Sequence, residues 1–96
     1  QAEALIVEGI AQANQNGDDA IAGEGMLALA QVFQAQGRRA AAEEHFRNAI
    51  AVLENAGLNG ALSNAYFRFG QALVSWGETA LGSEFLEKAY LRSRQP

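Results

Sequence analysis

The side chains best suited to chemistry gather at residues 43–45, where Glu43 and Glu44 precede His45, the only imidazole of the chain. A histidine beside carboxylates could transfer protons or bind a metal ion such as zinc. Consecutive residues of a helix, however, project about 100° apart, so these three cannot grip one ion together. We expect His45 to occupy a half-buried packing position, and we expect no catalytic residue, metal or other cofactor.

Two further groups could bind anions. Gly23 and Gly25 flank Glu24 in a weak likeness of a phosphate-binding loop, but the Gly–Lys–Ser/Thr that completes such a loop does not follow. Arg38 and Arg39 form the longest basic run, so an anion site there is the alternative to a solvated surface pair. Seven basic residues against eleven acidic ones, a net charge of −4, argue against a nucleic-acid partner.

The composition indicates one small helical domain. Of the 96 residues, 49% are hydrophobic, and Ala, the best helix former, is far commoner than the β-branched residues that favour strands. Cysteine is absent, which excludes disulfides and thiolate metal sites. No apolar run approaches the ~20 residues of a membrane span. We expect a single domain over residues 1–96, cut from a longer chain, with no membrane partner and a cytoplasmic location.

The sequence repeats at a spacing of forty residues. The segments QGRRAAAEEHFRNAI (36–50) and WGETALGSEFLEKAY (76–90) share Gly, Ala, Glu and Ala at matching places. Apolar residues before and after each turn recur at i, i+3, i+4 and i+7, the stripe of an amphipathic helix. Gly17 and Gly57 suit the left-handed ends of helices, and we expect Gly37 and Gly77 to mark a second, tighter corner. We expect helices at about 2–13, 20–36, 38–56, 60–76 and 78–94.

Two details of these helices also repeat. Asp19 and Asn59 each follow a turn glycine by two residues, and we expect their side-chain oxygens to cap the next helix. Small residues recur at one register of each pair, as in Gly70 and Gly82, where we expect the two helices to approach closely.

The repeated pattern is that of a known helical repeat. It reads Met26, Leu29–Ala30, Phe33, Gly37, Ala42, Phe46 and Ala49–Ile50 in the first copy, and Tyr66, Phe69–Gly70, Leu73, Gly77, Gly82, Leu86 and Ala89–Tyr90 in the second. This resembles the tetratricopeptide repeat. The resemblance implies an all-α, right-handed solenoid of antiparallel helix pairs with five helices: an orphan second helix (1–16) and two repeats (18–56 and 58–95). The forty-residue period exceeds the usual ~34 and is similar to that of longer repeats in bacterial transcription regulators and signalling ATPases.

The resemblance implies a non-enzymatic scaffold that binds a protein or peptide segment on a concave face formed by the first helix of each repeat. The residues expected on that face lie off the packing stripe: Glu24, Leu27, Gln31, Gln34, Asn64, Phe67, Arg68, Gln71 and Val74. Leu27 and Phe67 align forty residues apart, so we expect an apolar strip there, with an amide strip of Gln31 and Gln71 beside it.

The alternative is a structural or oligomerisation segment of a larger bacterial regulator. Solenoid repeats bury their faces only on neighbouring repeats, so the two ends of the stack need a cap. We expect Leu5, Ile6 and Ile10 to face outward at one end, and Phe85 and Tyr90 at the other. Such ends would form a homo-oligomer or pack on other parts of the parent protein.

Overall fold

The computed structural model of the chain describes residues 2–15 and 17–94, so the expected domain limits at residues 1, 16, 95 and 96 lie outside the described residues. Five α-helices make up this part of the chain, and no strand occurs in it: α1 (Ala2–Gln15), α2 (Asp19–Ala35), α3 (Arg39–Ala56), α4 (Asn59–Ser75) and α5 (Thr79–Ser93). The expected all-α class with five helices is confirmed, and every helix end falls within two residues of its expected place.

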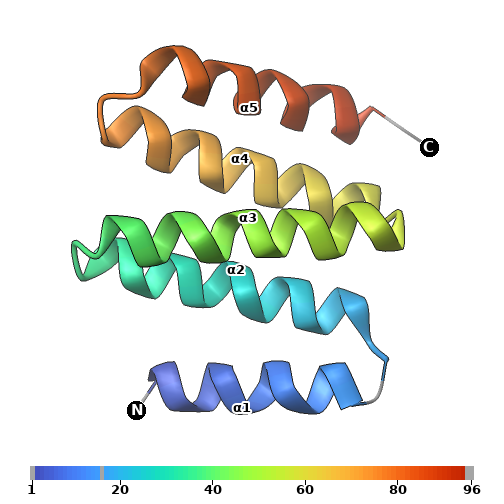
Figure 1. The fold of residues 1–96 in the computed structure, drawn as a ribbon. Helices are drawn as coiled ribbons and strands as arrows, with labels where there is room; N and C mark the ends of the chain where they lie inside the picture. The colour runs from blue at the N-terminus through green and yellow to red at the C-terminus, as the bar shows by residue number, and fades with distance from the viewer. Residues whose placement is uncertain (1, 16, 95–96) are drawn as a thin grey trace.

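Consecutive helices lie side by side and run in alternating directions (Figure 1). Each helix packs on the next one in the chain, and α2 also contacts α4. The Cα atoms extend over 36 × 35 × 14 Å, so the helices form a slab. In the described residues, no helix combines the length and the apolar character that crossing a membrane requires.

The turns share one backbone geometry. Their glycines have φ values of 70°, 75°, 68° and 87° at Gly17, Gly37, Gly57 and Gly77. In three turns the amide that follows the glycine donates to the carbonyl five residues earlier: Arg38 to Phe33, Leu58 to Leu53, and Glu78 to Leu73. This is the Schellman ending of a helix, which needs a left-handed residue and so favours glycine. The left-handed conformation expected at Gly17 and Gly57 is confirmed. The tighter corner expected at Gly37 and Gly77 is wrong, because their turns have the same left-handed glycine and the same hydrogen bond as the turn at Gly57.

The helix caps differ from the prediction. The N-cap residue of α2 is Asp18, whose Oδ1 accepts a hydrogen bond from the Ile21 amide at 3.1 Å. Asp19 is the first helical residue. The corresponding cap of α4 is Leu58, which has no capping side chain, and Asn59 is the first helical residue. Both capping predictions are wrong because the left-handed glycine is followed by a single non-helical residue, so each helix begins one residue earlier.

Aromatic rings join α3, α4 and α5 in the core. Phe46 and Phe69 are fully buried and stack with their centroids 5.2 Å apart. Phe85 lies 4.8 Å from Phe69 and 5.8 Å from Tyr66, also between centroids. Phe85 is only 8% exposed, so its predicted place on an outward face is wrong. Its ring points from α5 into the contact with α4.

The N-terminal helix is only partly as expected. Leu5 is 68% exposed, in agreement with an outward face. Ile6 and Ile10, in contrast, are half-buried and pack against the core. The prediction for these two isoleucines is wrong, because they lie on the side of α1 that meets α2.

Candidate functional site

His45 occupies a packing position, as expected. It is half-buried, and its Nδ1 lies 2.8 Å from the Ala41 carbonyl oxygen. A carbonyl only accepts, so Nδ1 is the protonated nitrogen that donates. The ring also lies 5.1 Å from the Phe33 ring, between centroids. Across residues 2–15 and 17–94, no three histidine or acidic side chains gather in a way that could hold a metal ion.

The glycines of the phosphate-loop likeness lie inside α2 and serve packing. A Cβ atom on Gly23 would lie 2.6 Å from Leu53 Cδ2, and one on Gly25 would lie 2.6 Å from Ile10 Cγ1. The absence of a side chain at these positions therefore allows Ile10 of α1 and Leu53 of α3 to pack closely against the backbone of α2.

The paired arginines contact aromatic rings and a carboxylate at the turns. Arg39 Nη2 lies 2.7 Å from Glu78 Oε2, and its guanidinium carbon lies 5.1 Å from the Trp76 ring centroid. The Arg38 guanidinium lies 4.5 Å from the Phe33 ring centroid. Both arginines are exposed, so these contacts belong to the protein surface and link the turn before α3 to the turn before α5.

Most of the predicted binding residues are exposed, with two exceptions. Exposed are Glu24, Gln31, Asn64, Phe67, Arg68, Gln71 and Val74. Gln34 is half-buried. Leu27 is only 5% exposed, so the prediction that it lies on a free face is wrong. The reason is that α2 contacts α4 as well as α1 and α3, and the strip of Leu27 and Phe67 does not form.

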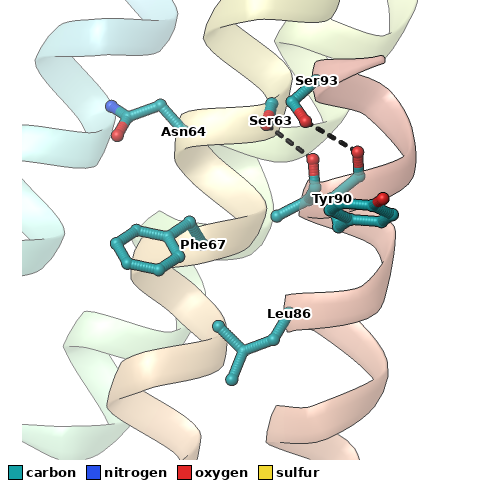
Figure 2. Close-up of a pocket in the computed structure, with 7 residues that line it drawn as sticks. Ser63, Asn64, Phe67, Leu86, Tyr90 and Ser93 are labelled. Carbon is teal, nitrogen blue, oxygen red and sulfur yellow. Dashed lines mark hydrogen bonds between the residues drawn. The ribbon is translucent and has the colours of Figure 1, made fainter. Parts of the chain in front are cut away.

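A hollow with a volume of about 550 Å³ lies between α4 and α5. We call it the α4–α5 pocket; its lining residues are Ser63, Asn64, Phe67, Leu86, Ala89, Tyr90 and Ser93. Figure 2 shows Leu86 reaching from α5 toward α4, while Phe67 projects from α4. Asn64 and Phe67 were predicted binding residues, whereas Ser63 of α4 and the residues of α5 were not. The α5 residues were missed because only first helices were expected to form the binding face.

Both serine hydroxyls of the α4–α5 pocket are engaged in hydrogen bonds to backbone carbonyls, and most of the other lining residues are apolar or aromatic. Ser63 Oγ donates to the Ala89 carbonyl oxygen, and Ser93 Oγ to the Tyr90 carbonyl oxygen, each at 2.7 Å (Figure 2). Phe67 is 43% exposed and Tyr90 is 57% exposed. Aromatic side chains exposed beside an apolar hollow are typical of interaction surfaces. The pocket can therefore bind apolar side chains.

A smaller hollow lies between α1, α2 and α3. Its volume is about 310 Å³, and its lining residues are Val7, Ile10, Ala11, Met26, Leu29, His45 and Asn48. Met26, Leu29 and His45 stand forty residues before Tyr66, Phe69 and Phe85, whose rings pack together in the second repeat. The side chains at these three positions are smaller than their counterparts in the second repeat.

Among the described residues, the acid with a strongly perturbed pKa is Tyr66, at the contact between α3 and α4. Its hydroxyl donates to Glu54 Oε2 at 2.6 Å. Burial, followed by the hydrogen bond and the negative charge of Glu54, raises the pKa of Tyr66 to about 12, while the charge of Arg92 opposes the shift. The phenol is therefore held neutral and serves as a hydrogen-bond donor between the two helices.

Comparison of the chain with family models, with curated proteins and with solved structures finds no match.

Proposed function

We propose that the chain is a non-enzymatic interaction module, a right-handed solenoid of tetratricopeptide-like helix pairs, that binds a protein or peptide segment. Two features support the solenoid. Left-handed glycines recur every twenty residues, from Gly17 to Gly77, and consecutive helices pack on one another in chain order. Regular turns and nearest-neighbour packing are what a repeat architecture requires.

The binding surface that we propose is centred on Phe67, and one observation carries the proposal. Phe67 stands 43% exposed at an apolar hollow of about 550 Å³, while Asn64, Arg68 and Gln71 of the same helix are exposed polar side chains. Interfaces commonly combine a buried aromatic anchor with a polar rim. The α4–α5 pocket with its rim has this composition, and a partner's side chain would bury Phe67.

The test compares the chain with its Phe67→Ala variant. Both serve as bait in a lysate of the source cells, and each captured protein is then titrated against the purified baits. Phe67→Ala should weaken the partner by about 1–3 kcal/mol, because an apolar anchor is lost. Glu43→Ala is the control, since Glu43 lies on α3 and outside the pocket. Equal affinities for the two variants, or loss with Glu43→Ala alone, would contradict the proposed surface.

The second candidate is a structural or oligomerisation segment of a larger bacterial regulator. Exposed apolar side chains on the first and last helices of the slab favour it: Leu5 and Val7 on α1, and Tyr90 and Leu91 on α5. Sedimentation equilibrium over a wide concentration range tests this candidate. Self-association that Leu5→Ser or Tyr90→Ser abolishes would support it. A monomer at every concentration, with no contact of α1 or α5 in the parent protein, would exclude it.

A further inference from the structure

We propose that the α4–α5 pocket binds an amphipathic α-helix of a partner polypeptide, which would lie on α4 and α5 as α4 lies on α2 and α3. The inference rests on the proposed interaction function and adds the chemical form of the partner. Its basis is the internal repeat, because an occupied copy of the same surface exists within this chain.

The occupied copy lies on α2 and α3. Forty residues before the lining residues of the pocket stand Gly23, Glu24, Leu27, Phe46, Ala49, Ile50 and Leu53. All of them except Glu24 are buried. Phe46 stacks on Phe69 of α4, and α4 contacts both α2 and α3. The earlier copy of the surface is therefore the seat of a helix.

The pocket continues this interface by one repeat. Leu27 is 5% exposed and Ile50 is 8% exposed, whereas their repeat equivalents Phe67 and Tyr90 are 43% and 57% exposed. The same positions are thus covered by a helix in one repeat and open in the other. A helix seated on the pocket would give Phe67 and Tyr90 the surroundings that Leu27 and Ile50 already have.

Side-chain size is balanced between the two copies. Leu27 and Ile50 are replaced by the larger Phe67 and Tyr90, while Phe46 and Leu53 are replaced by the smaller Leu86 and Ser93. Exchanges that conserve the total volume preserve the fit of an apolar surface. The pocket is therefore suited to a helix of about the same bulk as α4.

The seated helix needs a small residue where it meets the preceding second helix. On α2 this residue is Gly25, whose added Cβ would lie 2.6 Å from Ile10 Cγ1. On α4 the equivalent residue is Ala65, which is fully buried. Ile10 precedes Tyr90 by two repeats, so the partner helix should place Gly or Ala over Tyr90.

The other contact positions of the partner helix follow from α4. Leu62, three residues before Ala65, and Phe69, four residues after it, are both buried. The partner helix therefore needs apolar residues three before and four after its small residue. Tyr66 donates a hydrogen bond to Glu54, but the repeat equivalent of Glu54 is Arg94. Arg94 Nη1 donates to the Tyr90 hydroxyl at 2.9 Å, and its guanidinium lies 5.5 Å from the Tyr90 ring centroid. An acidic residue directly after the small one would therefore complement the charge that Arg94 holds beside Tyr90.

The test uses a synthetic peptide with the α4 sequence, residues 58–76, that carries Tyr66→Glu as its acidic residue. Isothermal titration calorimetry of this peptide into the full chain should show saturable binding. Phe67→Asp in the chain should weaken the binding about tenfold or more. Leu91→Asp is the matched control, because Leu91 is exposed on α5 and outside the pocket, and it should leave the affinity unchanged.

Two changes to the peptide test its chemistry. Ala65→Leu in the peptide should weaken binding about tenfold, since a large side chain cannot enter the close contact over Tyr90. A second peptide carries Lys instead of Glu at position 66. It should bind the chain more weakly than the Glu peptide does, and it should bind the Arg94→Glu variant up to about fivefold more tightly than it binds the unchanged chain. Circular dichroism verifies that every variant of the chain is folded.

Equal affinity of the peptide for the chain and for Phe67→Asp would overturn the inference, because the peptide would then bind elsewhere or exchange with the chain's own α4. An unchanged affinity of the Ala65→Leu peptide would overturn the proposed register. A peptide that does not bind, while Phe67→Ala still releases a captured partner, would refute the helical form of the partner and leave the interaction function standing.

Discussion

Gly70 of α4 and Gly82 of α5 bring two helix backbones into direct contact. A Cβ atom on Gly70 would lie 2.9 Å from the Gly82 carbonyl oxygen, and one on Gly82 would lie 2.8 Å from the Gly70 carbonyl oxygen. Such distances are shorter than any ordinary contact of a side-chain carbon. The close approach expected from the small residues at this register is confirmed.

Gly70→Leu should therefore destabilise the chain by about 3 kcal/mol or more, because backbone atoms cannot yield as flexible side chains can. Thermal or urea unfolding measures the change. Gly60→Ala is the matched control within α4, since nothing lies within 4 Å of an added Cβ there, and it should stabilise by about 0.4–1 kcal/mol. A Gly70→Leu chain as stable as the parent would show that α4 and α5 do not meet at this register.

The Tyr66–Glu54 hydrogen bond predicts a loss of stability at high pH. In the unfolded chain the phenol has its usual pKa of 10, and in the folded chain burial and Glu54 raise the pKa to about 12. Between these values the unfolded state binds fewer protons than the native state, so the free energy of unfolding falls as pH rises. Below pH 10 the contribution is fully present.

Tyr66→Phe should remove this pH-dependent loss and should cost about 0.5–1.5 kcal/mol at neutral pH, the usual contribution of a hydrogen bond. Urea unfolding at several pH values compares the two chains. Near-ultraviolet absorbance should also show one phenol that titrates near pH 12 and is absent from the variant. Parallel stability curves above pH 10 would contradict the assignment.

The N-cap of α2 predicts that alanine substitutions at two adjacent aspartates differ in how much they destabilise the chain. Asp18→Ala should destabilise by about 1 kcal/mol, because its carboxylate accepts the Ile21 amide hydrogen bond. Asp19→Ala should have a smaller effect, since Asp19 adds only a charge near the helix N-terminus. Chemical unfolding of both variants measures the difference. A larger loss for Asp19→Ala would show that the capping residue is Asp19 after all.

The Arg39–Glu78 pair predicts a weak, salt-sensitive link between two turns. Glu78→Gln should cost about 0.2–1 kcal/mol at low salt and less at high salt, because both side chains are exposed. Trp76 is the only tryptophan and lies under Arg39, so Arg39→Ala should also change its fluorescence. Glu84→Gln, at an exposed glutamate within α5, should leave stability and fluorescence unchanged. An identical salt response of the two glutamine variants would argue against the ion pair.

The sequence alone determined the helices, their turns and one close contact. These features depend on local physics: a left-handed position favours glycine, and an amphipathic stripe repeats every helical turn. The spacing of the glycines was therefore enough to place Gly57 and Gly77 at helix ends. The forty-residue alignment added the contact of Gly70 with Gly82, because both copies place small residues at the same register. The capping prediction was wrong by one residue, since helix ends depend on the particular turn.

Only the tertiary structure decided which aligned residues are free. Leu27 and Phe67 hold the same repeat position, yet one is 5% and the other 43% exposed. Ile50 and Tyr90 differ in the same way, at 8% and 57%. The periodicity of the sequence reveals the apolar stripe that packs against the other helix of the same repeat. It does not reveal the face that packs against the following repeat. α2 has α4 against that face, whereas no described helix follows α5 to cover the same face of α4.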